Sequence, residues 1–160
     1  MRLTKLFTIT FSAFSLALIA FSILVFTRST SPFIGFAGGA LEGQAREAPA
    51  DWAWTTPIAT VQLETSQAGD PYSVNLWGVG LGPNFYVGTR PEGTVWSANL
   101  DADPNVRLLI GPDLYALRAV KVDEDAEFQN VVSAYAEKYD TERAEMASTL
   151  GIIYRLDARR

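Results

Sequence analysis

Apolar and polar residues alternate along several short segments of this 160-residue chain. A two-residue period is typical of half-buried β-strands. In residues 58–65, for example, Ala59, Val61 and Leu63 share one face, whereas Thr60 and Glu64 lie on the other. Turn-forming Gly, Pro, Asp and Asn separate this segment from the segments that follow. The pattern predicts about six antiparallel strands, at residues 58–65, 72–79, 85–89, 106–110, 114–122 and 152–156.

Three other segments indicate helices. A short helix carries Trp96 and Asn99 on one face, and Pro104 forbids its continuation. A longer helix is predicted over 123–140, with an apolar stripe of Phe128, Val131, Val132, Tyr135 and Tyr139. A short helical piece follows at 142–149. Antiparallel strands with one crossover helix and one late helix predict a mainly β fold with some α, in the form of a small barrel.

The N-terminal residues 1–28 have a different character. Residues 6–27 are an uncharged, mostly apolar run of 22 residues. At about 1.5 Å per residue, this run is long enough to cross a hydrocarbon core about 30 Å thick. Arg2 and Lys5 precede it and Arg28 follows, so the positive-inside rule favours a domain on the extracytoplasmic side. We expect a single-pass membrane anchor here, with a cleaved signal peptide as the alternative.

The rest of the chain divides by composition. Residues 29–57 are rich in Ser, Thr, Gly, Pro and Ala and show no sustained period, which predicts a linker. Trp52 and Trp54 are expected to be aromatic anchors where this linker docks on the domain. The domain itself is expected at 58–160.

Composition also limits the chemistry. The chain contains no Cys and no His, which excludes thiolate nucleophiles, imidazole acid–base catalysis and the common zinc and haem ligand sets. We therefore expect no metal site. The formal net charge is −5 and no basic cluster is present, so nucleic acid is not an expected partner. No carboxylate pair is marked as a general acid and base, so the catalytic residues stay unassigned.

Residues 96–108 read Trp-Ser-Ala-Asn-Leu-Asp-Ala-Asp-Pro-Asn-Val-Arg-Leu. This stretch resembles the helix-to-strand junction of the split β-barrels that bind flavins or deazaflavins, the superfamily of pyridoxamine 5'-phosphate oxidases and deazaflavin-dependent nitroreductases. The resemblance runs from about residue 58 to residue 156. It implies a single split β-barrel (FMN-binding-like) domain, a cofactor that is FMN or the deazaflavin F420, and a homodimer that builds its site across two subunits.

The same resemblance implies a cofactor site made of Asn75, Thr89, Arg90, Trp96 and Asn99. Many members carry Arg or Lys at the start of the tryptophan helix, where this chain has Gly-Thr-Val at 93–95. Arg90 is the nearest replacement, so it is expected to hold the cofactor phosphate. Every site residue also has a structural alternative: a hydrogen-bonded pair, a solvated loop, core packing or bracing of the helix.

Arg118 shares its predicted strand face with apolar residues such as Leu114 and Val120. A guanidinium on an apolar face needs a partner. A carboxylate such as Glu64, a carbonyl group, a dimer interface or a ligand is expected to supply it.

Two functions fit these observations. The first is a membrane-anchored oxidoreductase whose flavin or deazaflavin performs hydride or electron transfer on a small-molecule substrate. The second is a split barrel without a cofactor that acts as a membrane-attached binding or interaction module. The cofactor is accordingly FMN, F420 or none.

Overall fold

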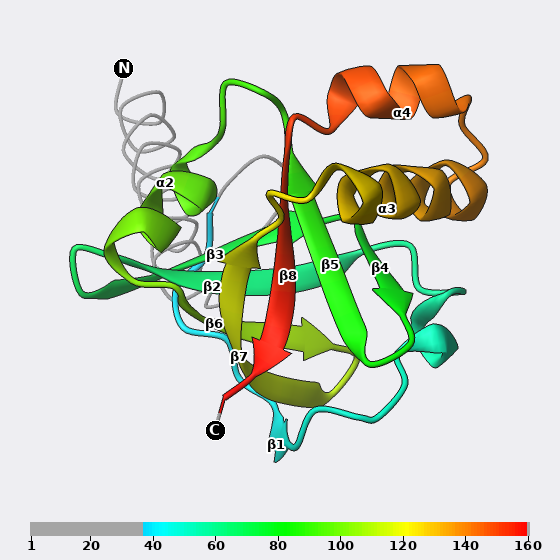
Figure 1. Cartoon of the computed structure of the whole chain (residues 1–160). Helices are drawn as coiled ribbons and strands as arrows, with labels where there is room; N and C mark the ends of the chain where they lie inside the picture. Colours follow the sequence, from blue (N-terminus) through cyan, green and yellow to red (C-terminus); the bar gives the residue numbers. More distant parts are fainter. Residues whose placement is uncertain (1–36, 160) are drawn as a thin grey trace, which may run out of the picture.

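A computed structural model describes residues 37–159, which form one curved β-sheet with α-helices on its outside (Figure 1). The strand order is β3-β2-β6-β7-β8-β5-β4, and every neighbouring pair along this path is antiparallel. The short strand β1 adds to β7 in parallel. The strands are β1 (Gln44–Arg46), β2 (Val61–Gln67), β3 (Asp70–Leu76), β4 (Gly78–Leu81), β5 (Asn84–Thr89), β6 (Asn105–Ile110), β7 (Asp113–Lys121) and β8 (Ile152–Ala158). The helices are the 3₁₀-helix η1 (Ala53–Thr55) and the α-helices α2 (Val95–Ala102), α3 (Asp125–Lys138) and α4 (Arg143–Thr149).

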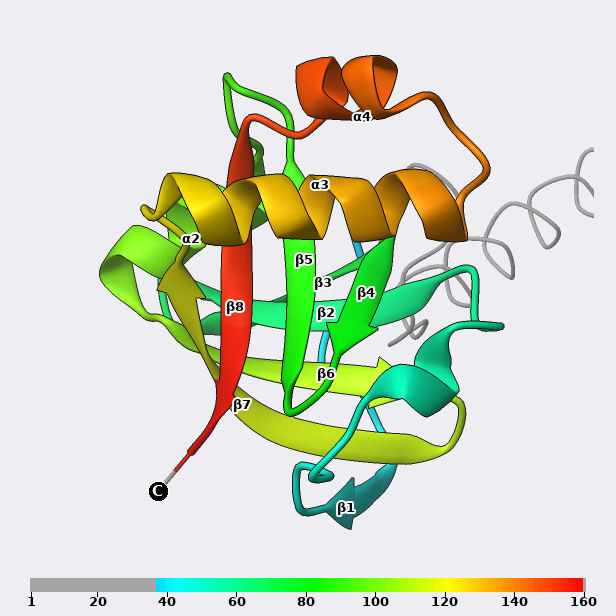
Figure 2. The ribbon, with the colours of Figure 1, turned by 45° about the vertical axis from the view of Figure 1, so that its right-hand side comes forward.

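The two edge strands of this sheet are neighbours in the sequence. β3 ends at Leu76 and β4 begins at Gly78, so Trp77 alone separates opposite edges. Because consecutive Cα atoms lie about 3.8 Å apart, the sheet has to curl until its edges approach each other at this point. The result is the half-barrel seen in Figure 2, which is consistent with the predicted split β-barrel.

The continuous strand predicted at 72–79 is wrong, because the structure has two strands there. Gly78 pairs with Val87 of β5 rather than continuing along β2. A Cβ atom at residue 78 would lie 2.5 Å from a ring carbon of Phe85, so any larger residue would force the buried Phe85 ring to move. Seven antiparallel strands therefore replace the six predicted strands within the described residues.

Apolar side chains pack on both faces of the sheet. In both views α3 lies across the outer face, with α4 beyond it (Figures 1 and 2). The apolar stripe predicted for the long helix is confirmed, since Val131, Val132 and Tyr135 are completely buried. The core inside the barrel includes Trp52, Leu63, Phe85, Leu108, Leu117 and Leu156, and the core beneath the helices adds Met146 and Ile153.

Residues 37–57 lie on the barrel. β1 pairs with β7, and Gly38 exchanges two backbone hydrogen bonds with Ser73 of β3. Trp52 is 1% exposed and meets Tyr115 edge-on, so the prediction of a core anchor is confirmed for this residue. Trp54 is 46% exposed and stacks outside Trp52, so it is not a core anchor.

The predicted anchor at 1–28, and the first part of the predicted linker, lie outside the described residues. Within residues 37–159, no helix has both the length and the apolar character that a membrane span requires.

Candidate functional site

Helix α2 begins at a capped turn close to the end of β5. The backbone N–H of Thr94 donates to the Ser97 hydroxyl over 2.9 Å, and this hydroxyl donates back to the Thr94 carbonyl over 2.9 Å. Gly93 precedes the turn with a φ of +76°, a conformation that favours glycine. The loop after β5 therefore bends sharply into the helix, and the hydroxyls of Thr94 and Ser97 lie together at its start.

Trp96 and Asn99 both have structural roles on α2. Trp96 is 6% exposed and meets Tyr154 of β8 edge-on, with 5.8 Å between the ring centroids. The Asn99 amide donates a 2.9 Å hydrogen bond to the hydroxyl of Thr65 on β2. These contacts pack and brace the helix against the barrel, while contact of either residue with a cofactor stays a prediction.

Thr89 and Arg90 lie at the same end of the barrel. The buried Thr89 hydroxyl donates to the Thr94 hydroxyl over 3.3 Å. The exposed Arg90 guanidinium donates to the Gly93 carbonyl over 3.2 Å and lies 4.0 Å from the Glu92 carboxylate. The Arg90 side chain is thus held by its own loop.

Asn75 lies apart from the other four predicted site residues. It is an exposed residue of β3 whose amide oxygen accepts a 3.1 Å hydrogen bond from Gln62 of β2. Thr65, which Asn99 contacts, pairs with Tyr72 in the same sheet. Asn75 lies three positions after Tyr72 in β3, which corresponds to about 10 Å along the strand. The structure therefore gathers Thr89, Arg90, Trp96 and Asn99 around α2 and leaves Asn75 outside this group.

A pocket of about 350 Å³ opens between α2 and the neighbouring ends of β7 and β8. We term it the α2 pocket. Its polar groups are two hydroxyls, one phenol, one ammonium and two carboxylates, from Thr94, Ser97, Tyr154, Lys121, Glu92 and Asp101. Burial, and secondarily the charge of Asp101, raise the pKa of Tyr154, so its phenol keeps the proton at neutral pH and is able to donate a hydrogen bond.

Lys121 is a lining residue of the α2 pocket that sequence reasoning missed. It is the last residue of β7 and pairs with Tyr154 of β8, and both residues line the α2 pocket. Arg90 does not line this pocket. The sequence marked Lys121 only as the end of a strand, and its position beside α2 follows from the strand order, which alternation does not specify.

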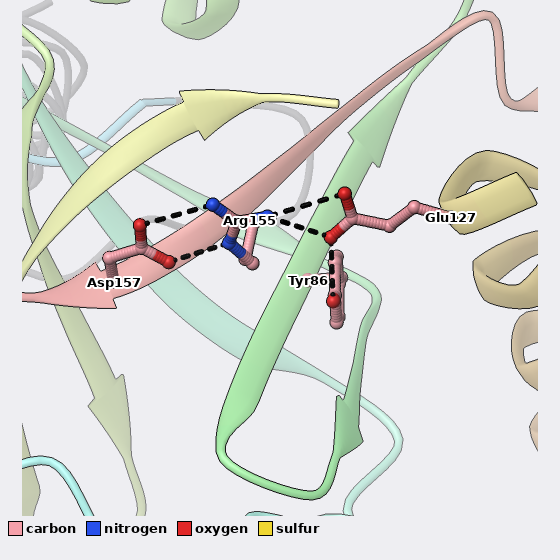
Figure 3. Close-up of polar contacts among 4 residues, drawn as sticks. All are labelled: Tyr86, Glu127, Arg155 and Asp157. Atoms are coloured by element: carbon pink, nitrogen blue, oxygen red, sulfur yellow. Dashed lines mark hydrogen bonds and ion pairs between the residues drawn. The ribbon is translucent and has the colours of Figure 1, made fainter. Parts of the chain in front are cut away.

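A chain of polar side chains ties α3 to the outer face of the barrel (Figure 3). Glu127 of α3 accepts hydrogen bonds from the Tyr86 hydroxyl and from Arg155, both at 2.9 Å. The other side of the Arg155 guanidinium donates to Asp157 over 2.8 and 3.4 Å. These contacts, to Asp157 first and then to Glu127, raise the pKa of Arg155. The cluster fixes the position of Arg155 on the outside of β8.

Arg118 shares its face of β7 with Leu114 and Val120 as predicted, but its predicted pairing with Glu64 is wrong. The inward face of β7 carries Tyr115, Leu117 and Ala119, whereas Arg118 is exposed on the opposite face. The predicted partner Glu64 binds Arg107 of β6 instead, with 2.7 Å between the guanidinium Nε and the carboxylate. Both faces of β7 carry apolar residues, so alternation alone does not tell which face the closed barrel buries.

A curled antiparallel sheet around one apolar core, with a helix leading directly into β6, defines this protein as a split β-barrel. The chain belongs to the F420H2-dependent quinone reductase family, whose sequence model matches residues 60–156. The expected resemblance is therefore confirmed. No curated protein sequence matches this chain.

Several solved structures share the fold. An F420H2-dependent reductase is 17% identical with a TM-score of 0.55, and the match covers 74% of this chain and 100% of that chain. A proposed pyridoxamine 5'-phosphate oxidase from Listeria innocua is 14% identical with a TM-score of 0.54, covering 65% and 86%. A protein described as a domain-swapped dimer is 19% identical with a TM-score of 0.54, covering 62% and 81%. Identities this low establish a shared fold alone.

Proposed function

We propose that this domain is an oxidoreductase that binds a deazaflavin or flavin in the α2 pocket, with F420 as the preferred cofactor. The observation that carries the proposal is the grouping of Lys121, Thr94 and Ser97 in one pocket, within the residues that the family model matches. The reductase among the structural neighbours supports the same class of reaction.

The donor set of the α2 pocket fits a phosphate ester. An ammonium group and two hydroxyls are suitable partners for phosphate oxygens. Lys121 lines the pocket from β7. It would supply the positive charge that Arg or Lys supplies at the start of the tryptophan helix in many family members, where this chain has Gly-Thr-Val. Glu92 and Asp101 line the same pocket, and their negative charges oppose a phosphate. Affinity for the cofactor should therefore depend strongly on Lys121.

A deazaflavin supplies hydride-transfer chemistry when it is bound. The residues of this chain would bind and orient it. Lys121 and the two hydroxyls would hold the phosphate, and the protonated Tyr154 phenol would donate a hydrogen bond. Trp96 packs behind Tyr154 and keeps its ring in place.

Titration of the full chain with F420 and with FMN, followed by fluorescence, tests this proposal. A hydrogen bond to a charged group contributes about 1.5–3 kcal/mol, so Lys121→Gln should weaken F420 binding by roughly ten- to a hundredfold. Arg90→Gln is the comparison variant and should weaken binding less, because its guanidinium is held by Gly93 and Glu92. If Arg90→Gln causes the larger loss, the phosphate binds at the 90–93 loop instead.

The alternative function is a barrel without a cofactor that binds another molecule. The carboxylates of Glu92 and Asp101 in the α2 pocket favour this alternative, because they oppose an anionic cofactor. Failure of the unaltered chain to bind either F420 or FMN would establish it in place of the oxidoreductase.

We also propose that the protein is a homodimer held at a membrane by residues 6–27. The domain-swapped dimer among the structural neighbours supports the dimer, and the uncharged run of 22 residues supports the anchor. Light scattering on the detergent-solubilised chain tests the dimer. A monomer at high micromolar concentration would exclude it.

A further inference from the structure

A second concave surface lies on the outer side of the barrel, away from the α2 pocket. It is a groove of about 900 Å³, within the size range of small-molecule sites. Its polar lining comes from the outward-facing parts of β7 and β8 and from the starts of β5 and β6. We term it the arginine groove, and its polar residues are Arg118, Arg155, Arg159, Asp157, Asn84 and Asn105.

The arginine groove is locally positive on an acidic protein. Three guanidinium groups and one carboxylate line it, so the lining residues carry a formal +3 − 1 = +2, whereas the whole chain carries −5. The Glu127 carboxylate, which binds Arg155 from α3, lies outside this lining. The single carboxylate, Asp157, already accepts two hydrogen bonds from Arg155. Much of the negative charge in the groove is therefore already paired.

Arg118 is the guanidinium available to a ligand. Its side chain has no hydrogen bond or ion pair with any other residue in the range 37–159. The register of β7 places it opposite Asn105 on one side and Asp157 on the other. Asp103 is the other nearby carboxylate. Its pKa is lowered mainly by the backbone hydrogen bond from Asn105 and to a lesser degree by the charges of Arg159 and Arg118.

The neighbouring arginines are held in place by the fold. Arg159 donates from Nε to the Leu117 carbonyl over 2.9 Å and from Nη2 to the Val106 carbonyl over 2.7 Å. Arg155 is fixed between Glu127 and Asp157 (Figure 3). Two ordered guanidinium groups thus flank the unpaired one. Their positive charges are fixed in the groove before a ligand arrives, so no further side-chain entropy of Arg155 or Arg159 is lost on binding.

The remaining lining is apolar. Ala48, Pro49 and Pro83 face the groove beside the arginines. A ligand that fills the groove would therefore place an apolar body against these residues and an anionic group at the guanidinium side.

We propose that the arginine groove binds a small organic carboxylate, with its carboxylate paired to Arg118 and its apolar body against Pro49 and Pro83. Guanidinium matches a carboxylate through two parallel hydrogen bonds. This site is separate from the proposed cofactor pocket, since the two share no lining residue.

Calorimetric titration of the full chain with benzoate tests the site, with benzamide as the uncharged ligand of similar shape. Benzoate should bind at least tenfold more tightly than benzamide. Arg118→Gln should weaken benzoate binding at least tenfold, while the melting temperature stays the same because the Arg118 side chain is exposed. Arg143→Gln is the matched control, since it removes an exposed arginine on α4 and should leave the affinity unchanged.

Equal affinities for benzoate and benzamide, no benzoate binding, or an unchanged affinity in Arg118→Gln would each overturn the proposal. The F420 titration separates it from the proposed function. Arg118→Gln should leave F420 binding unchanged, and Lys121→Gln should leave benzoate binding unchanged.

Discussion

Asn99 on α2 and Thr65 on β2 are joined by a 2.9 Å hydrogen bond between the asparagine amide and the threonine hydroxyl. The Thr65 side chain is almost completely buried, and its hydroxyl donates onward to the Tyr72 carbonyl over 3.3 Å. One wall of the α2 pocket is therefore fixed to the β2–β3 hairpin by a polar contact. Asn99, predicted as a cofactor contact, supports the site through its bracing of the helix.

Asn99→Ala should lower the free energy of unfolding by about 1–3 kcal/mol, because a partly buried hydrogen bond is lost and the Thr65 hydroxyl loses its donor. Urea unfolding followed by circular dichroism measures this. Asn75→Ala is the matched control and should change the free energy by about 0.5 kcal/mol or less, since Asn75 is exposed. Equal losses in the two variants would contradict the bracing role.

The parts of this site that the sequence predicted are local. The three-residue spacing of Trp96 and Asn99 and the stop at Pro104 act within one turn of helix, and α2 forms at Val95–Ala102 as those signals require. The hydrogen bond between Asn99 and Thr65 joins residues that are 34 positions apart in the sequence, and the pattern did not predict it. The helix that carries Asn99 was nevertheless predicted at the right place.

The parts that were missed depend on contacts between distant strands. Lys121 reaches the α2 pocket because β8 inserts between β7 and β5. The exposure of Arg118 was not predicted, because apolar residues occupy both faces of β7 and alternation does not tell which face the barrel buries. The break at Trp77 follows from the approach of the Phe85 ring to Gly78. The alternation of apolar and polar residues within one strand does not specify which strands become neighbours or which face the barrel buries.

Gly151→Ala should destabilise the domain and weaken cofactor binding together. A Cβ atom at residue 151 would lie 2.2 Å from the Pro91 Cα, and the Gly151 N–H donates to the Thr89 carbonyl over 2.8 Å. The backbone of the 90–93 loop would have to move, at a cost of about 1–3 kcal/mol. Thermal unfolding and the F420 titration measure the two effects.

Gly39→Ala is the control for Gly151→Ala, because no atom lies within 4 Å of the position that its Cβ would occupy. It should leave both measurements unchanged. An unaltered melting temperature in Gly151→Ala would show that the loop accommodates the methyl group.

Deletion of residues 6–27 should release the protein from membranes. The run is uncharged and long enough to span a bilayer, so the full chain should stay in the pellet after alkaline carbonate extraction, and the deletion variant should appear in the supernatant. Release of the full chain would exclude the anchor. A mature protein whose N-terminus has been shortened would instead support a cleaved signal peptide.

The contact between Tyr86 and Glu127 predicts a loss of stability at alkaline pH. Burial raises the pKa of Tyr86, and the hydrogen bond to Glu127 and the negative charge of Glu127 raise it further, to about 12. An unperturbed tyrosine has a pKa of about 10. The folded protein holds this proton more tightly than the unfolded chain does. The stabilisation is therefore complete below about pH 10 and is lost as the pH rises through the folded-state pKa.

Glu127→Gln tests this assignment, because it removes the charge beside the Tyr86 phenol and keeps an oxygen that can accept its hydrogen bond. The pKa of Tyr86 should fall toward that of an unperturbed tyrosine. Ultraviolet absorbance of the phenolate measures the change, and Tyr86→Phe in each background identifies the Tyr86 signal among the six tyrosines. The same variant should also loosen α3, since Arg155 loses its charged partner on that helix. A Tyr86 titration that does not move when the charge is removed would assign the raised pKa to burial alone.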